Sequence, residues 1–472
     1  MEFNQVTHYF RSSAMALAVA SGWMVPTQAY AANDQAIMQE LAAMRDQMSQ
    51  MAQRINTLEG QLADANAKAE AAQAATAAIP AQIASAQTAS AKPSTQVSWD
   101  GAPKLTGEGG WSFKPRGRLQ VDVAGVDAPS GIASTDSLGI GTEFRRAYIG
   151  FDGTMPGGFG YRVEADLANS GVELTDLYLT YKASPQVTLT LGQHKPFWSM
   201  EEMTSDLFTS FMERAAFNSA FGYERRVGFS GAYAGKDFVV QAGVFADNAA
   251  DLAGNNGDKN NSYSFDGRAV FMPKLGDGQL HVGGSFHVRD FNDAQASTRY
   301  RARPFVHTTD VRLVDTNNMS ATGERSFGAE LAYIRGRFHA TTESQWITAM
   351  RPGLANPTFN GGYAEVGYLL TDDKTAYKGG AYDRIRPKNP LGKGGMGALQ
   401  VNARYDWLDL SDAGIVGGRQ QVAGLSAVWT PTDYTRFILN YGHIWVKDAA
   451  VAAGADRNYS ADSIGMRAQF DF

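Results

Sequence analysis

The 472-residue chain contains no cysteine, which excludes a disulfide framework, thiolate metal sites and cysteine nucleophiles. Beyond its N-terminus it also lacks a long apolar run, which argues against a helical membrane protein. The formal net charge is -6 and no basic tail or stripe is present, so nothing indicates nucleic-acid binding. By contrast, 50 glycines and an aromatic content of 11% are typical of proteins with many short strands and tight turns.

The first 31 residues have the pattern of a secretory signal peptide. Arg11 supplies the positive charge, a short apolar stretch follows, and Ala29, Tyr30 and Ala31 fit a small-x-small cleavage site. The apolar stretch is too short to anchor the chain permanently. We therefore expect an exported bacterial protein whose mature chain begins at Ala32.

Residues 33–79 carry the pattern of a coiled coil. Large apolar residues recur at alternating spacings of four and three, which makes an unbroken heptad seam. The seam consists of Ile37, Leu41, Met44, Met48, Met51, Ile55, Leu58 and Leu62. We predict a periplasmic coiled coil of two or three helices that ends at Pro80, followed by a flexible linker over residues 80–104. A single amphipathic helix lying on a folded domain is the alternative.

The last residues of the chain alternate between apolar and polar or small side chains. The apolar positions are Ile464, Met466, Ala468, Phe470 and Phe472. A period of two that ends on an aromatic residue is typical of the closing strand of an outer-membrane β-barrel, with one face in lipid and the other in water. We expect Phe470 and Phe472 to be the C-terminal signal for the barrel-assembly machinery. An edge strand of a soluble sheet is the alternative.

Alternating runs of about ten residues recur after Lys114 and number about sixteen, while no convincing helical segment follows that residue. An even number is what a single-chain bacterial barrel requires. The predicted fold is therefore all-β: a transmembrane antiparallel barrel over residues 105–472, embedded in outer-membrane lipid and preceded by the α-helical coiled coil.

Arginines occur on the face of these runs that is opposite to the aliphatic residues. They are Arg118, Arg146, Arg162, Arg226, Arg268, Arg289, Arg337, Arg404, Arg436 and Arg467. Carboxylates accompany them on the same face, at positions that include Asp122, Glu164, Asp176, Glu330, Glu343, Asp406 and Asp471. Charged groups at membrane depth require hydration and pairing, so we expect a water-filled lumen. The arginines either pair with the carboxylates and stiffen the wall or form a ladder that attracts anions.

Eight motifs follow one another beyond the predicted linker. They are FKPRGRLQVD at Phe113–Asp122, FRRAYIGFDGT at Phe144–Thr154, LGQHKPFWSMEEMTSD at Leu191–Asp206, FMERAAFNSAF at Phe211–Phe221, LHVGGSFHVRD at Leu280–Asp290, RARPFVHTTDVRLVDT at Arg301–Thr316, YLLTDDKTAYKGGAYDRIRPKNP at Tyr368–Pro390 and RYDWLDLSD at Arg404–Asp412. In this order they resemble the phosphate-selective porin O/P family of bacterial outer-membrane porins.

The resemblance implies a homotrimer of sixteen-stranded barrels, each with a loop folded into its own pore, here about Pro196–Tyr223. It also implies a constriction formed by residues of the first strands and of this loop. These residues are Arg118, Arg145, Arg146, Asp176, Glu201, Glu202, Asp206 and Arg214. Phosphate-selecting members carry a loop lysine where this chain has Glu202. A carboxylate repels phosphate at short range, so strong phosphate selection requires that the arginines outweigh the loop carboxylates.

Three functions are compatible with these features. The first is a porin for passive diffusion of small hydrophilic solutes, biased toward anions such as phosphate. The second is a weakly selective or cation-preferring porin, with selectivity set by Glu201, Glu202 and Asp206. The third is a structural tether, in which the coiled coil joins the outer membrane to peptidoglycan or to a periplasmic partner. We expect no enzymatic activity, catalytic residue, cofactor or metal site.

Overall fold

The computed structural model describes residues 31–86, 95–132, 138–168, 171–223, 225–253, 262–291 and 297–472. The predicted signal peptide lies outside these residues, apart from Ala31. The chain divides into two units, Met1–Lys92 and Pro93–Phe472, and each has its own architecture.

The described part of the first unit is the helix α1 (Ala31–Ala86), which has 56 residues and is about 84 Å long at a rise of ~1.5 Å per residue. Five members of the predicted seam have described side chains, and these are 55–62% exposed. They are Met48, Met51, Ile55, Leu58 and Leu62. The stripe is therefore available for contact with other chains, while the coiled coil itself stays a prediction. None of the described helices has the length and hydropathy needed to cross a membrane.

The expected end of this helix at Pro80 is wrong, because α1 continues to Ala86. A proline inside a helix removes one backbone hydrogen bond and costs ~3 kcal/mol. The flanking sequence is rich in alanine, the residue with the highest helix propensity, so the helix continues on both sides. The expectation of a structureless linker up to residue 104 is also wrong. There β1 (Gln96–Asp100) and β2 (Ala102–Thr106) form an antiparallel hairpin.

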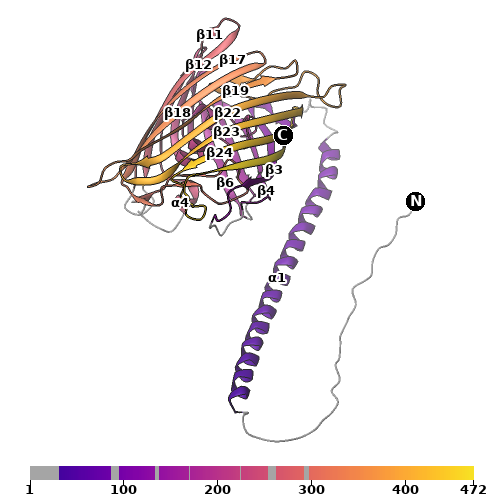
Figure 1. The fold of residues 1–472 in the computed structure, drawn as a ribbon. Coiled ribbons are helices and arrows are strands. Elements are labelled where there is room, and N and C mark those ends of the chain that lie inside the picture. The colour runs from indigo at the N-terminus through magenta and orange to yellow at the C-terminus, as the bar shows by residue number, and fades with distance from the viewer. Residues whose placement is uncertain are drawn as a thin grey trace. The chain divides into compact units, whose positions relative to one another are not determined.

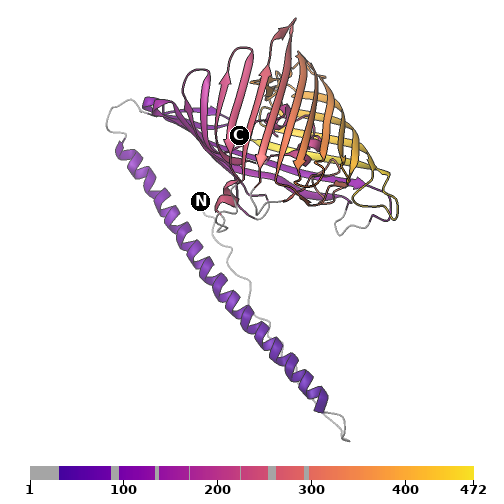
Figure 2. The same cartoon turned by 90° about the vertical axis from the view of Figure 1, so that its left-hand side faces the viewer.

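The second unit contains a closed antiparallel β-barrel with tilted strands (Figures 1 and 2). Within the described residues its wall has sixteen strands, and each pairs with the next along the chain. They are β3 (Ser112–Asp127), β4 (Gly141–Met155), β5 (Phe159–Asp166), β6 (Glu173–Lys182), β7 (Val187–His194), β8 (Arg226–Ala234), β9 (Phe238–Phe245), β10 (Tyr263–Phe271), β12 (Gly278–Asp290), β17 (Gly323–Arg335), β18 (Phe338–Met350), β19 (Thr358–Leu369), β22 (Ala398–Asp412), β23 (Ile415–Thr432), β24 (Thr435–Lys447) and β25 (Tyr459–Asp471).

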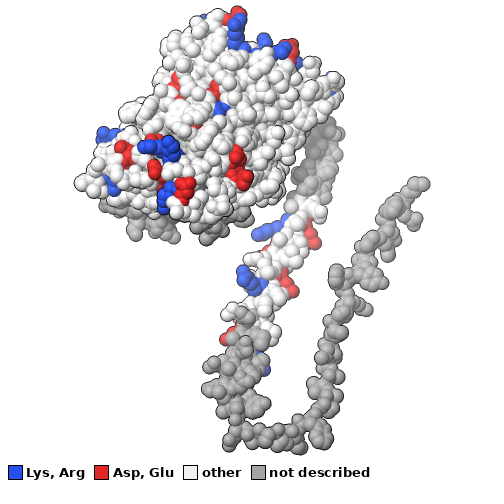
Figure 3. All heavy atoms as spheres, in the orientation of Figure 1, with Lys and Arg blue, Asp and Glu red and all other residues white. Residues whose placement is uncertain are grey.

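The barrel closes where β25 pairs with β3, in a register that places Asp471 opposite Arg118. In Figure 1 the yellow C-terminal strands accordingly lie beside the purple β3. The alternation of the last strand is confirmed, since Ile464 and Phe470 are 58% and 50% exposed while Arg467 is fully buried. Most of the outer surface in Figure 3 is uncharged, and charged side chains gather mainly toward the ends of the strands. The predicted barrel and its strand number are thus confirmed.

Short elements occur in the connections between the strands. They are η1 (Glu108–Gly110), η2 (Pro156–Gly158), α2 (Met200–Met203), α3 (Ala216–Phe221), α4 (Ala249–Ala253), β11 (Lys274–Leu275), β13 (Ser297–Thr298), β14 (Arg301–Ala302), β15 (Val314–Asp315), β16 (Met319–Ser320), β20 (Tyr377–Lys378) and β21 (Ala381–Tyr382).

The connections at one end of the barrel are mostly tight. Residues 156–158, 235–237 and 336–337 join adjacent strands there, as periplasmic turns do in outer-membrane barrels. The same end carries one long connection, residues 370–397, which we name the periplasmic insert. Its hairpin of β20 and β21 is fixed to the inner wall, because the Arg268 guanidinium donates to the carbonyl of Gly380 at 2.7 Å.

Two connections from the opposite end contribute to the interior. We name them the first inward loop (residues 195–223) and the second inward loop (residues 297–322). The first was predicted, whereas the second inward loop and the periplasmic insert were not. Both inward loops pack against the inner face of β18–β25 in one large apolar cluster. This cluster includes Trp198, Phe211 and Phe217 of the first loop and Leu313 of the second, all at most 1% exposed.

The expectation of a wholly hydrated interior is therefore wrong on the side of β18–β25. The inner faces of these strands carry residues such as Ile347, Phe359 and Ile444, each fully buried by the loops. Apolar side chains are tolerated on an inner face wherever a loop removes them from water.

A pair of glycines makes room for the second inward loop. Gly424 of β23 and Gly442 of β24 lie opposite each other in the sheet. A Cβ atom at Gly442 would come within 2.6 Å of Cδ1 of Phe305, and one at Gly424 would come within 2.9 Å of the same ring. The phenyl ring of Phe305 thus occupies the space that side chains would take.

We predict that Gly442→Ala loosens the second inward loop without opening the barrel. The added methyl group overlaps the Phe305 ring, and overpacking of this kind costs ~1–3 kcal/mol. Limited proteolysis of the folded protein in detergent measures loop release, and heat-modifiable migration in gels measures barrel integrity. Gly231→Ala is the matched control, because the nearest atom to its added Cβ would be 3.4 Å away. Equal protease resistance in the two variants would contradict the prediction.

Candidate pore constriction

The interior holds a cavity of about 660 Å³, which we name the vestibule. Strands β3–β9, the first inward loop and the periplasmic insert contribute to its lining. Ten basic side chains line it: Lys114, Arg116, Arg118, Arg146, Arg162, Lys195, Arg214, Arg225, Arg384 and Arg386. Six acidic ones accompany them: Asp100, Glu164, Asp176, Glu202, Asp206 and Asp471. The open side of the barrel is thus lined by an excess of positive charge.

Two small chambers adjoin the vestibule through shared residues. A chamber of about 80 Å³ shares Arg146, Glu202, Asp206 and Arg214 with it, and we name these four residues the neck. A second chamber of about 60 Å³ shares Arg145 and other residues with the first and reaches the second inward loop. The neck therefore lies between the vestibule of about 660 Å³ and the chamber of about 80 Å³.

A β-bulge aims two consecutive arginines of β4 into the interior. Gln120 pairs with Arg146 and Val121 with Phe144, so Arg145 is the extra residue on its strand. Phe144 before the bulge is 58% exposed on the lipid-facing side, and Tyr148 after it lines the vestibule. The bulge changes the phase of alternation, and both guanidinium groups meet carboxylates of the first inward loop.

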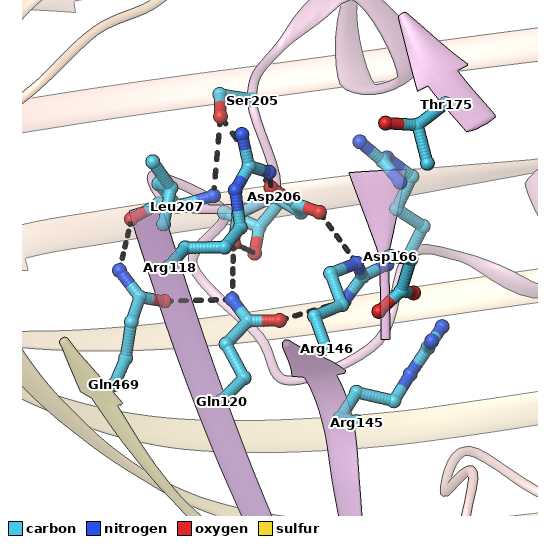
Figure 4. Close-up of polar contacts among 12 residues, drawn as sticks. Arg118, Gln120, Arg145, Arg146, Asp166, Thr175, Ser205, Asp206, Leu207 and Gln469 are labelled. Carbon is cyan, nitrogen blue, oxygen red and sulfur yellow. Dashed lines mark hydrogen bonds and ion pairs between the residues drawn. The ribbon is translucent and has the colours of Figure 1, made fainter. Parts of the chain in front are cut away.

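Asp206 of the first inward loop lies between two wall arginines (Figure 4). One carboxylate oxygen accepts from the Arg118 guanidinium, and the other is 2.5 Å from Nε of Arg146. Gln120 holds Arg146 in place by accepting a 2.8 Å hydrogen bond from it. Burial by itself would raise the pKa of Asp206, but Arg118 and Arg146 outweigh it and hold that pKa well below the usual value.

Glu202 occupies the other side of the neck. Its carboxylate is 2.6 Å from Nζ of Lys195 and 3.4 Å from Nε of Arg214. Burial would raise its pKa, whereas these two cations lower it, and the net shift is downward. Lys195 was not among the predicted site residues. Little in the sequence indicates this contact, because Lys195 lies seven positions before Glu202 and the turn of the loop brings the two residues together.

Lys195 is itself strongly affected by its surroundings. Burial lowers the pKa of its ammonium group to about 8, although Glu202 opposes this shift. Arg214 and Arg225 lower the pKa further. The charge of the neck region therefore changes near neutral pH.

Glu213 forms a third ion-paired contact and was also missed. Its carboxylate accepts 2.9 and 3.1 Å hydrogen bonds from Arg145 and a 2.8 Å bond from Arg467 of the closing strand. Burial opposes ionisation, but Arg145 and Arg467 hold the pKa of Glu213 well below its ordinary value. The loop thus contacts both β4 and β25 through one side chain.

Glu201 was predicted at the constriction, but its side chain points from the loop toward the wall strand β22 and the residue is 5% exposed. Its carboxylate is 2.5 Å from the Arg404 guanidinium and accepts 3.0 and 2.9 Å hydrogen bonds from the Ala215 amide and Asn218. Burial raises its pKa in spite of Arg404. Glu201 therefore fastens the loop and does not line the cavities.

Wall carboxylates anchor the two short helices of the loop. The backbone amides of Met200 and Glu201 donate to Glu343 of β18 at 2.7 and 2.8 Å. The amide of Ala216 donates to Asp406 of β22 at 3.0 Å. These carboxylates satisfy amides that a helix N-terminus leaves without intrahelical partners.

The predicted wall arginines occupy different surroundings. Arg162 lines the vestibule, and Arg268 lines an adjoining cavity of about 330 Å³ beside the periplasmic insert. Arg404, Arg436 and Arg467 are buried against the first inward loop. Four of these arginines also pair with wall carboxylates: Arg162 with Asp176, Arg268 with Glu330, Arg404 with Glu365 and Arg467 with Asp122.

Three others lie near the ends of strands. Arg226 and Arg289 share Asp247, at 3.6 and 2.8 Å. The placement of Arg337 on the inner wall is wrong, because it lies in the turn before β18 and pairs with Asp372 of the periplasmic insert at 2.8 Å. The alternation of side chains along a strand does not predict the direction of Arg337, because β18 begins only at the next residue, Phe338.

The vestibule wall and floor complete the site. Asp176 is 2.6 Å from Nε of Arg225, which was not predicted, and 3.7 Å from Arg162. Arg384 of the periplasmic insert pairs with Asp471 of the closing strand and stacks on the Phe208 ring at 5.0 Å. The sequence feature that could have revealed this insert is the long interval between the two predicted strands that flank it.

An apolar outer surface, a closed sixteen-strand wall and a charged interior with adjoining cavities define an outer-membrane channel. The sequence profile of the family described as phosphate-selective porin O and P matches residues 113–472. The chain belongs to this family. Family and fold indicate a channel rather than an enzyme.

The chain is also similar to one curated protein and to solved outer-membrane proteins. An uncharacterized protein of Caulobacter vibrioides is 42% identical over 477 residues, covering 98% of this chain and 96% of the relative. In-vitro folded OmpT, an outer-membrane protein of Vibrio cholerae, has a TM-score of 0.50 at 11% identity, covering 77% of this chain and 98% of its own. An anion-selective porin from Comamonas acidovorans has a TM-score of 0.46 at 14% identity, covering 76% and 100%. The likeness to OmpT shows the fold.

We predict that the ratio of anion to cation permeability falls as the pH rises from about 7 to about 9. Lys195, with a pKa of about 8, is then converted from mainly charged to mainly neutral, and one positive charge beside the neck is lost. Reversal potentials in a potassium chloride gradient measure the ratio of anion to cation permeability. Lys195→Arg should keep its ratio across this range, because arginine stays charged. An equal pH-dependent fall in Lys195→Met would contradict the assignment to Lys195.

Proposed function

We propose that the protein is a channel for passive diffusion of small hydrophilic solutes with a bias toward anions, including phosphate-type anions. The observation that carries this proposal is the excess of ten basic over six acidic side chains around the vestibule. Fixed charges that surround a narrow aqueous space attract ions of opposite sign and raise their local concentration.

The arrangement along β3 supports a continuous route. Lys114, Arg116 and Arg118 occupy alternate positions of that strand and all line the vestibule, at intervals of about 6.6 Å along the chain. The row leads from the beginning of the strand to Arg118, which contacts the neck residue Asp206. An anion entering the vestibule thus meets basic groups at each step.

A weakly selective or cation-preferring channel is the second candidate. It is favoured by the carboxylates that the first inward loop brings to the passage, Glu202, Asp206 and Glu213. Each of these carboxylates contacts at least two basic side chains, so little of their charge is uncompensated. This pairing supports the anion-biased alternative.

Reversal potentials in a salt gradient test the proposal. The wild-type potential should lie on the anion side, and Arg116→Gln should lower the permeability ratio about twofold, as the loss of one charge ~10 Å from a hydrated ion implies. Arg337→Gln makes the same change outside the lumen and should leave the ratio unaltered. A wild-type potential on the cation side would reject anion bias.

We further propose that α1 is a periplasmic assembly clamp that joins three copies through its seam. The exposure of Met51, Ile55, Leu58 and their seam neighbours supports this, because a narrow apolar stripe is buried when heptads of several copies pack together. A helix of this length would also suit a tether to peptidoglycan or to a periplasmic protein, and the two roles are compatible.

Charge introduced into the seam separates these roles. The double variant Ile55→Glu and Leu58→Glu should lose the trimer, measured as mass by light scattering in detergent, because it places carboxylates at packed positions. Gln53→Glu and Thr57→Glu form the matched control, since both positions lie off the seam. Intact trimers combined with a weakened cell envelope would reject the clamp and favour the tether.

A further inference from the structure

The neck contains an anion site that the protein itself fills. The Asp206 carboxylate bridges the guanidinium groups of Arg118 and Arg146, one oxygen to each. Gln120 donates to the carbonyl of Asp206 at 3.3 Å and accepts from Arg146, so both the loop and one arginine are oriented by the same side chain. Two guanidinium groups that converge on one two-oxygen acceptor suit carboxylates and phosphates in general.

The site lies between two adjoining cavities of the interior. Arg146 and Asp206 line both the vestibule and the adjoining chamber of about 80 Å³. A solute that passes between these spaces therefore moves along the Arg146–Asp206 contact. The opposite side of the neck is occupied by Glu202 and Arg214, which are also paired, at 3.4 Å.

Contacts other than those of the Asp206 side chain also hold the loop in place. The carbonyl of the next residue, Leu207, accepts hydrogen bonds of 3.0 and 3.1 Å from Arg436 and Gln469. On the other side, the carbonyl of Thr204 accepts a 2.9 Å hydrogen bond from Arg214, and its hydroxyl oxygen accepts a 3.2 Å bond from the Tyr382 amide of the periplasmic insert. The backbone on both sides is thus fixed independently of the carboxylate.

We propose that Asp206 is a tethered competitor, which passing oxyanions must displace from Arg118 and Arg146. The inference rests on the proposed anion-biased channel and adds a residue that determines specificity among anions. Solutes with two acceptor oxygens, such as phosphate or carboxylates, replace both contacts at once, whereas chloride does not. Asp206 then sets how strongly an oxyanion must bind in order to occupy the neck.

The test measures block of single-channel chloride current by inorganic phosphate. Asp206→Asn should lower the half-blocking phosphate concentration about tenfold, because a competing charge is removed while both arginines remain. Asp152→Asn is the matched control: its carboxylate also bridges two wall arginines, Arg116 and Arg162, at 2.7 and 3.3 Å, but it lies outside the neck. This control should change the concentration less than about twofold. Asp206→Glu keeps the charge and should stay close to the wild type.

The outcomes are distinguishable. Equal effects of Asp206→Asn and Asp152→Asn would show a general charge effect and would overturn the inference while leaving the anion bias intact. A wild-type reversal potential on the cation side would instead reject the proposed function. Asp206→Ser provides a second neutral variant. Failure of both neutral variants to form heat-resistant barrels would identify Asp206 as a structural anchor and would also overturn the inference.

Discussion

The pairing of wall arginines with carboxylates of the first inward loop is the interaction on which the rest of the interior depends. Asp206 and Glu213 each contact two wall arginines, and Glu201 contacts Arg404 of β22. Glu202 instead contacts Lys195 and Arg214 of the loop itself. Charges this far from bulk water are stable only when they are paired and hydrogen-bonded, so the loop and the wall stabilise each other's ionised states. The same contacts define the neck, so the residues that attach the loop are also those to which we assign the channel's selectivity.

The interior is divided into an apolar half and a charged half. Against β18–β25 the two inward loops form a core that resembles the interior of a soluble domain, and the opposed glycines Gly424 and Gly442 admit the ring of Phe305. Against β3–β9 the wall carries Arg116, Arg118, Arg146 and Arg162, which line the vestibule. Hydrophobic contacts hold the first inward loop against β18–β25. On its other side, ion pairs with arginines of β3 and β4 fix its position. A passage therefore remains on the charged side, although the barrel itself is wide.

Local patterns in the sequence were sufficient for the wall but not for what fills it. Alternation reflects which face of a strand meets lipid, a property of each strand alone, and it located all sixteen strands. The bulge at Arg145 depends on the register with β3, and the contact of Lys195 with Glu202 depends on a turn. Family resemblance identified most arginines of the constriction, but it could not show that Glu201 is withdrawn behind the loop. The continuation of α1 past Pro80 shows that a local breaker signal can be overridden by flanking residues.

The central claim is that loop carboxylates are neutralised by wall arginines, which leaves positive potential at the neck. Because the chain contains no cysteine, Ser205→Cys would place a single thiol beside Asp206, in the lining of the vestibule. The most direct measurement is its rate of modification by anionic and by cationic methanethiosulfonate reagents, each divided by the rate for a free thiol in solution. The account predicts that the anionic reagent reacts faster after this correction. Faster reaction of the cationic reagent would contradict it.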